Sequence, residues 1–181
     1  MGNTTNTKKI ALAGLFTALA LIASFIELPI FPAAPWLKYD PSGVVCLIAA
    51  LAFGPKLGLV VAVLSWLPKL FLDPLGMLMG VLNTCALALP AAAIYARAGR
   101  TRAASVAGML VGGALAVALS CAANLVVTPL YTAASVEQVM GMIFPILLPF
   151  NLLKAALSIA AGQLLLAPCM NVLREGGANR A

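Results

Sequence analysis

The sequence predicts an all-α integral membrane protein with six transmembrane helices and with its N- and C-termini in the cytoplasm. Of its 181 residues, 63% are hydrophobic and 9% are charged, whereas soluble globular domains carry about 25% charged residues. The mean hydropathy is +1.07. Several apolar runs approach the roughly 20 residues that an α-helix needs to cross a bilayer. We therefore expect residues 1–181 to form a single transmembrane domain in the cell membrane.

Charges, prolines and glycines interrupt the apolar runs and divide them into six predicted helices. Gly54-Pro55 and Asp73-Pro74 predict tight turns before and after the third helix. The helices are predicted at residues 10–28, 42–53, 57–72, 75–96, 103–127 and 149–172, and the last has a helical lead-in from residue 139.

The first two helices need separate justification. The first could be mistaken for a secretory signal, but no small-x-small cleavage site ends the run before Glu27 and Pro29, so we expect it to be retained. The second is too short to cross as a straight helix. We expect it to be tilted, shielded by its neighbours, or extended back into the preceding loop.

The basic residues set the expected orientation, because cytoplasmic segments of membrane proteins are enriched in Lys and Arg. Residues 1–9 and 173–181 are then cytoplasmic tails, and residues 29–41 form an extracellular loop. The net charge of +6 follows from this topology, so no nucleic-acid partner is expected. Eight of the eleven basic residues fall on the cytoplasmic side: Lys8, Lys9, Lys56, Arg97, Arg100, Arg102, Arg174 and Arg180.

The composition excludes several functional classes. The chain has no histidine, which removes Ser-His and Cys-His nucleophile pairs and His-ligated metal sites. It has no G-x-x-x-x-G-K-[ST] phosphate loop, so it cannot hydrolyse ATP by that route. The four cysteines are far apart in apolar segments and suggest no metal or redox pair. We expect neither an enzyme nor a bound cofactor or metal.

Three polar side chains in apolar helices are candidates for a binding site. Asn151 and Lys154 are three residues apart, so they share a helix face. Pro149 suits the first turn of that helix and would place Lys154 at a shallow depth. Asn124 lies near the same end of the fifth helix. Lys154 could instead extend along its aliphatic stem to the interface, and Asn124 could join two helices.

Two further segments each have two interpretations. The loop at 29–41 contains four prolines and cannot be a regular helix; it is either an ordinary connector or a lid, since Trp36, Leu37 and Tyr39 are unusually apolar for a solvated loop. On the first helix, Gly14 and Ala18 form a small-x-x-x-small pair. Such a pair lets another helix approach closely, either within this chain or from a partner.

Four stretches of the chain resemble the substrate-binding S components of energy-coupling factor (ECF) transporters, most closely the riboflavin-specific ones. The Phe-Gly-Pro hairpin and the Pro-Phe-Asn-x-x-Lys stretch are the more specific features of the resemblance. In chain order the stretches are ASFIELPIFPAAPWLKYDPS, LAFGPKLGLVVAVL, NLVVTPLY and LPFNLLKAAL.

The resemblance implies a six-helix subunit that binds riboflavin near the extracellular side and works with a membrane coupling subunit and two cytoplasmic ATPases. It implies that the small-residue face of the first helix, at Gly14 and Ala18, docks on the coupling subunit. It also assigns polar contacts with riboflavin to Asn124, Asn151 and Lys154, and a lid strand to Leu37, Lys38, Tyr39 and Asp40.

The chain departs from the family pattern at two places. The family has Asp-x-Ser-Asp where this chain has Asp-Pro-Ser-Gly at residues 40–43, so the second acid is missing. A Lys-Asn pair of the third helix is replaced by Ser65-Trp66. These departures leave open an S component for another small vitamin or precursor. A stand-alone carrier that needs no ATPase is a further alternative.

Overall fold

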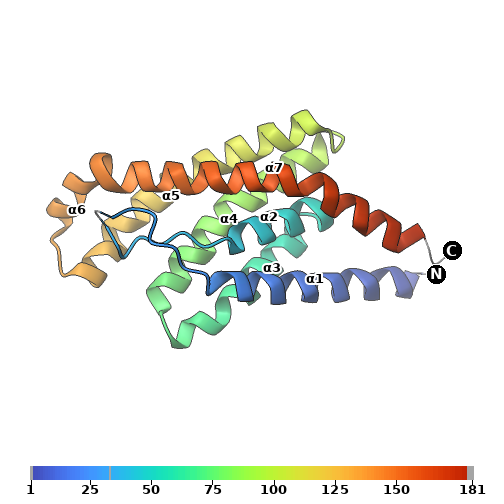
Figure 1. Cartoon of the computed structure of the whole chain (residues 1–181), viewed down its shortest axis with the longest axis horizontal. Helices are drawn as coiled ribbons and strands as arrows, with labels where there is room; N and C mark the ends of the chain where they lie inside the picture. Colours follow the sequence, from blue (N-terminus) through green and yellow to red (C-terminus); the bar gives the residue numbers. More distant parts are fainter. Residues whose placement is uncertain (1, 33, 179–181) are drawn as a thin grey trace.

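The computed structural model describes residues 2–32 and 34–178, with side chains from residue 7 to residue 173, and most of this part of the chain is helical (Figure 1). A single β-bridge, between Leu28 and Tyr39, accompanies the helices. The α-helices are α1 (Gly2–Ser24), α2 (Ser42–Phe53), α3 (Pro55–Trp66), α4 (Pro74–Arg97), α5 (Arg102–Thr132), α6 (Val136–Met142) and α7 (Leu148–Ala178).

Four stretches of the described chain are long and apolar enough to cross a membrane: Thr7–Ser24, Pro74–Arg97, Arg102–Thr132 and Val136–Leu173. The helices α2 and α3 occupy the places of the second and third predicted helices but have 12 residues each. The predicted tails are helical as far as they are described, since α1 begins at Gly2 and α7 ends at Ala178. Met1 and residues 179–181 of those tails lie outside the described residues.

The short helix α2 lies at the centre of the bundle. It packs against α1, α3, α4 and α7, and eight of its residues are buried. It begins at Ser42 and ends at Phe53, as predicted, and does not extend back into the loop. Shielding by neighbouring helices is therefore how this short apolar helix is accommodated.

Three predicted helix ends are wrong: the first and third helices end earlier than predicted, and the fifth, predicted to end at residue 127, continues to Thr132. The first helix was predicted to reach residue 28, but α1 ends at Ser24, and Leu28 pairs with Tyr39 instead. The third was predicted to reach residue 72, but α3 ends at Trp66 and a 3-10 helix, η1 (Leu67–Phe71), follows. Pro68 lies within η1, where its missing N–H disfavours a continued α-helix.

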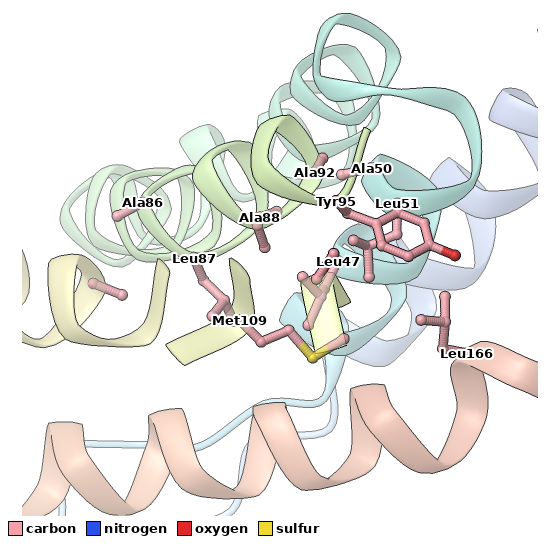
Figure 2. Packing of buried hydrophobic residues seen from close by; sticks show 13 residues of the cluster. Leu47, Ala50, Leu51, Ala86, Leu87, Ala88, Ala92, Tyr95, Met109 and Leu166 are labelled. Atoms are coloured by element: carbon pink, nitrogen blue, oxygen red, sulfur yellow. The ribbon is translucent and has the colours of Figure 1, made fainter. Parts of the chain in front are cut away.

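The hydrophobic core joins α2, α4, α5 and α7. Figure 2 shows Leu47 of α2, Leu87 of α4 and Met109 of α5 meeting between these helices, and Leu166 of α7 belongs to the same cluster. The pair α4 and α5 has the most extensive contact of any two helices. Glycines make this contact possible, because a Cβ on Gly112 would lie 2.2 Å from the carbonyl oxygen of Leu87.

The end of the bundle opposite the α4–α5 turn is closed by the first loop and by α6. A π-helix, η2 (Ile143–Leu147), connects α6 to α7, so the helical lead-in to the last helix begins at Val136. Ala34 and Leu37 of the loop pack against Val139, Leu147 and Phe150. Figure 1 shows the first turns of α1 and the last turns of α7 together at the other end.

We expect Gly112→Ala to destabilise the protein by about 1–3 kcal/mol, because the added methyl group would overpack the α4–α5 contact against backbone that cannot move freely. Gly141→Ala in α6 is the matched control, since a Cβ there meets nothing within 4 Å. Thermal unfolding of the two variants in detergent micelles measures the difference. Equal stability of both would mean that the close approach of α4 and α5 is not required.

Candidate functional site

A cavity of about 230 Å³ lies at the loop end of the bundle. The first loop, the end of α3 with η1, the N-terminal half of α4, the C-terminal half of α5 and the start of α7 form its walls. Of the seven residues predicted to contact a ligand, six line this cavity: Leu37, Lys38, Asp40, Asn124, Asn151 and Lys154.

The charges in the lining balance. Three lysines and three acidic residues line the cavity, so its formal charge is zero. Sequence reasoning identified half of these groups as site residues and assigned no ligand contact to the others. The six are Lys38, Lys69, Lys154, Glu27, Asp40 and Asp73.

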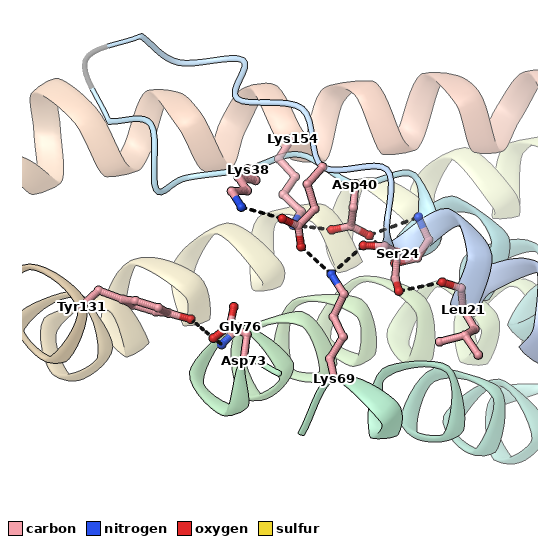
Figure 3. Close-up of polar contacts among 11 residues, drawn as sticks. Leu21, Ser24, Lys38, Asp40, Lys69, Asp73, Gly76, Tyr131 and Lys154 are labelled. Carbon is pink, nitrogen blue, oxygen red and sulfur yellow. Dashed lines mark hydrogen bonds and ion pairs between the residues drawn. The ribbon is translucent and has the colours of Figure 1, made fainter. Parts of the chain in front are cut away.

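Lys154 is paired with a carboxylate from the end of the first loop. Its ammonium lies 3.4 Å from Oδ2 of Asp40, and the side chains are 15% and 6% exposed (Figure 3). The other oxygen of Asp40 accepts hydrogen bonds from the backbone N–H and the hydroxyl of Ser42, which hold it at the start of α2. An unpaired charge at a helix centre in a bilayer costs roughly 2.5–3.5 kcal/mol. Asp40 thus explains how α7 accommodates a lysine.

The two asparagines differ in the hydrogen-bonding capacity they leave for a ligand. Asn151 is 4% exposed, and its Nδ2 donates to the Leu147 carbonyl at 2.8 Å. Its Oδ1 accepts no hydrogen bond within the described part of the chain. Asn124 is more fully engaged: its Nδ2 donates to the Ser120 carbonyl at 2.7 Å, and its Oδ1 accepts from Thr128 at 2.9 Å. Asn151 and the remaining N–H groups of Lys154 are therefore the freer polar groups.

A second ion-pair group, which sequence reasoning missed, is centred on Glu27. Its two carboxylate oxygens accept from different lysines, Oε2 from Lys38 and Oε1 from Lys69, each at 2.6 Å. Burial raises the pKa of Glu27, but the hydrogen bonds and charges of the two lysines outweigh it, so the pKa lies below its ordinary value. Glu27 is therefore ionised at neutral pH.

Lys69 is more buried than Lys154, with the side chains 6% and 15% exposed, and it has a different environment. Its ammonium also donates to the Ser24 carbonyl at 2.6 Å, and it lies 5.5 Å from the Phe25 ring centre and 5.0 Å from that of Trp66. At these distances both rings contribute cation–π attraction. Its position in an apolar segment was a signal of the same kind as that of Lys154, but we expected only an extracellular surface charge there.

Trp66, at one of the departures from the family pattern, lines the cavity and is 5% exposed. A Cβ on Gly80 would lie 2.4 Å from the Trp66 ring, so the missing side chain of this glycine makes room for the indole. Among the described residues, no acceptor is found for the indole Nε1–H. The third helix therefore contributes a large aromatic wall to the site.

Further hydrogen bonds link the helices around the cavity. Tyr131 at the end of α5 donates to Oδ1 of Asp73 at 2.5 Å, and the same oxygen accepts the Gly76 N–H at the start of α4. Asn83 donates to the Ser120 hydroxyl at 2.8 Å. All five of these residues line the cavity. The helices α4 and α5 are therefore joined by polar contacts near the site as well as by close packing.

The remaining predicted site residues lie away from the cavity. Tyr39 is buried outside the lining, and its backbone N–H and carbonyl pair with those of Leu28 at 2.8 Å. Burial raises the pKa of its phenol. Gly14 and Ala18 are exposed on α1, and a Cβ on Gly14 would meet nothing within 4 Å. Internal packing therefore does not account for this pair of small residues.

A second hollow, of about 430 Å³, lies between α4, α5 and α7 near the α4–α5 turn. Arg102, Ser105 and Gln163 are among its lining residues, and Gln163 donates to the Ser105 hydroxyl at 3.2 Å. No residue predicted from the sequence to contact a ligand lines it. The first cavity is therefore the candidate site.

Known proteins with similar sequences and a similar solved structure match most of this chain. The chain is 28% identical to the riboflavin transporter RibU of Streptococcus thermophilus (93% of this chain, 86% of that protein) and 29% identical to RibU of Staphylococcus aureus (84% and 85%). The solved structure of the S component of a bacterial ECF transporter matches with a TM-score of 0.80 and 26% identity, over 93% of this chain and 98% of that one.

The family comparison covers most of the bundle. The model of the substrate-specific component of ECF transporters matches residues 8–162, from the first turns of α1 to the middle of α7. Members of this family are components of transport proteins. This agrees with a multi-pass protein of the plasma membrane that has several long apolar helices. The chain belongs to the family of substrate-specific components of ECF transporters.

Proposed function

We propose that this protein binds riboflavin from the outside of the cell and delivers it with a membrane coupling subunit and two ATPases. The observation that carries the proposal is a cavity at the loop end of the bundle that brings together Asn124, Asn151 and Lys154. The names of the two RibU relatives support riboflavin as the ligand.

The chemistry of the lining suits a flavin. A flavin has a planar apolar ring system, which favours aromatic and aliphatic walls, and a polar edge with a hydroxylated tail, which favours a few directed hydrogen bonds. Trp66, Leu37 and Phe150 provide apolar surface. Lys154 provides donors and Asn151 an unused acceptor.

The size of the cavity implies that it widens on binding. Its volume of about 230 Å³ is smaller than the roughly 300–1,000 Å³ of sites for drug-sized ligands. The first loop is the wall with the least regular structure, whereas α4 and α5 are held together by close backbone contact. We therefore infer that the loop acts as the lid and moves to admit the ligand.

The proposed topology has six membrane crossings with both ends of the chain in the cytoplasm. The helices α2 and α3 supply the two short crossings, shielded by the longer helices. The exposed face of α1 at Gly14 and Ala18 would then dock on the coupling subunit. The ATPases would supply the energy, since the chain carries no phosphate-loop motif of its own.

A different small vitamin or precursor is the second candidate ligand, and Trp66 favours it. The indole stands where the family pattern has an asparagine, and it lines one wall of the cavity. A thermal-shift screen of vitamins separates the two candidates. Stabilisation by riboflavin alone would remove this alternative, whereas stabilisation by another vitamin and not by riboflavin would establish it.

We expect Lys154→Gln to weaken riboflavin binding about 10- to 100-fold and Asn151→Ala about 2- to 10-fold, the costs of losing a charged and a neutral hydrogen bond. Quenching of flavin fluorescence during titration measures both. Lys56→Gln and Asn171→Ala are matched controls, since both residues are exposed and lie outside this cavity.

The thermal stability of each variant is measured alongside, because Lys154→Gln leaves the buried Asp40 carboxylate without its counter-charge. A folded Lys154→Gln variant with unchanged affinity would show that Lys154 serves only the ion pair. No binding by the unmodified protein at micromolar riboflavin would refute the proposed ligand.

We expect Gly14→Leu and Ala18→Leu to leave riboflavin binding intact but to reduce uptake at least about tenfold, because bulky side chains prevent close helix approach. Ala114→Leu, at an exposed position on α5, is the matched control. Uptake is measured in vesicles with and without the coupling subunit and ATPases. Riboflavin uptake by this protein alone would instead support the stand-alone carrier.

A further inference from the structure

Glu27 joins two parts of the cavity wall that are far apart in the sequence. Lys38 belongs to the first loop, and Lys69 belongs to η1 after the third helix. Each lysine contacts a different oxygen of the carboxylate at 2.6 Å. The loop is therefore connected to η1 through one side chain, and Figure 3 shows Lys38 and Lys69 pointing toward this meeting point.

The β-bridge at the base of the loop sets up this arrangement. The N–H of Leu28 donates to the Tyr39 carbonyl and the N–H of Tyr39 donates to the Leu28 carbonyl, both at 2.8 Å. Glu27 and Lys38 each directly precede one of the bridged residues, which brings the two side chains within reach of each other. The loop between them is thereby closed at its base and held to η1 by Lys69.

The two ion pairs of Glu27 differ in burial. The Lys69 side chain is 6% exposed and also bonds to the Ser24 carbonyl, whereas the Lys38 side chain is 49% exposed. Removing the counter-charge of a buried lysine strongly destabilises the folded protein, whereas an exposed ion pair opens readily because water can solvate both groups. The pair that can open without unfolding is therefore the one between Glu27 and Lys38.

We propose that Glu27 is a positioning residue for ligand binding: anchored to Lys69, it holds the first loop over the cavity through Lys38, and each opening of the loop breaks the Glu27–Lys38 pair. This inference rests on the proposed function, in which the loop must move to admit a ligand. The Asp40–Lys154 pair holds the other end of the loop in the closed state. Because the ligand passes the same loop on binding and on release, the Glu27–Lys38 pair slows both steps.

The test uses stopped-flow fluorescence quenching with riboflavin. We expect Lys38→Gln to raise both the association and the dissociation rate about two- to five-fold, the effect of an exposed ion pair, with little change in affinity. Lys38→Arg should restore both rates. High salt of about 1 M, where the Debye length is about 3 Å, should bring the unmodified protein to the rates of Lys38→Gln and leave that variant unaffected.

A double-mutant cycle separates this role from direct ligand contact by Lys38. In the Glu27→Gln background, whose folding is verified by thermal unfolding because Lys69 loses its counter-charge there, Lys38→Gln should change neither rate further. Glu137→Gln, an exposed acid of α6 in no ion pair within the described part, is the control and should leave both rates unchanged. Equal effects of Lys38→Gln in both backgrounds, or no effect in either, would overturn the proposal.

A measurement without ligand keeps this inference separate from the proposed function. Hydrogen exchange at the Leu28 and Tyr39 amides, which form the bridge, reports opening of the loop base. Lys38→Gln should accelerate exchange at both amides, and Glu137→Gln should not. If riboflavin fails to bind but exchange accelerates in Lys38→Gln, the proposed ligand is wrong and the role of the Glu27–Lys38 pair in holding the loop is supported. Unchanged exchange in Lys38→Gln would refute that role, whatever the ligand.

Discussion

The ion pairs of two lysines, the buried Lys69 and the partly buried Lys154, determine how the loop end of the protein is built. Lys69 and Lys154 lie in apolar segments, and each needs a carboxylate close by. The carboxylates lie at the two ends of the first loop, Glu27 just before it and Asp40 within its last residues. The path of the loop over the cavity therefore follows from the pairing of buried charges, and a proline-rich segment is held in place with little regular structure of its own.

In the rest of the bundle, the helices are held together by close packing at small residues rather than by ion pairs. Gly112 lets α5 meet the backbone of α4. The central helix α2 is short because the longer helices surround it. One end of the molecule is thus a closely packed apolar frame, and the other holds the polar groups that could contact a ligand.

The sequence predicted the helical class, the bounds of α2 and the shared face of Asn151 and Lys154, because hydropathy and helical periodicity are local properties. It did not predict that α1 ends at Ser24, since the end depends on a bridge between Leu28 and Tyr39. The partner of Lys154 lies 114 positions away, and that of Lys69 lies 42 away. Such pairings arise from tertiary structure. The sequence could therefore identify Lys154 as an unusual residue, but it could not predict which carboxylate pairs with it.

The balance of charges in the cavity has an electrical consequence for a protein of the plasma membrane. Moving one elementary charge across the membrane potential changes the free energy by about 2.3 kcal/mol per 100 mV. The lining contains as many acidic groups as lysines. If the ligand is uncharged and the groups keep their protonation states, the occupied and empty cavities have the same net charge. The transmembrane voltage then has little effect on the free energy of binding.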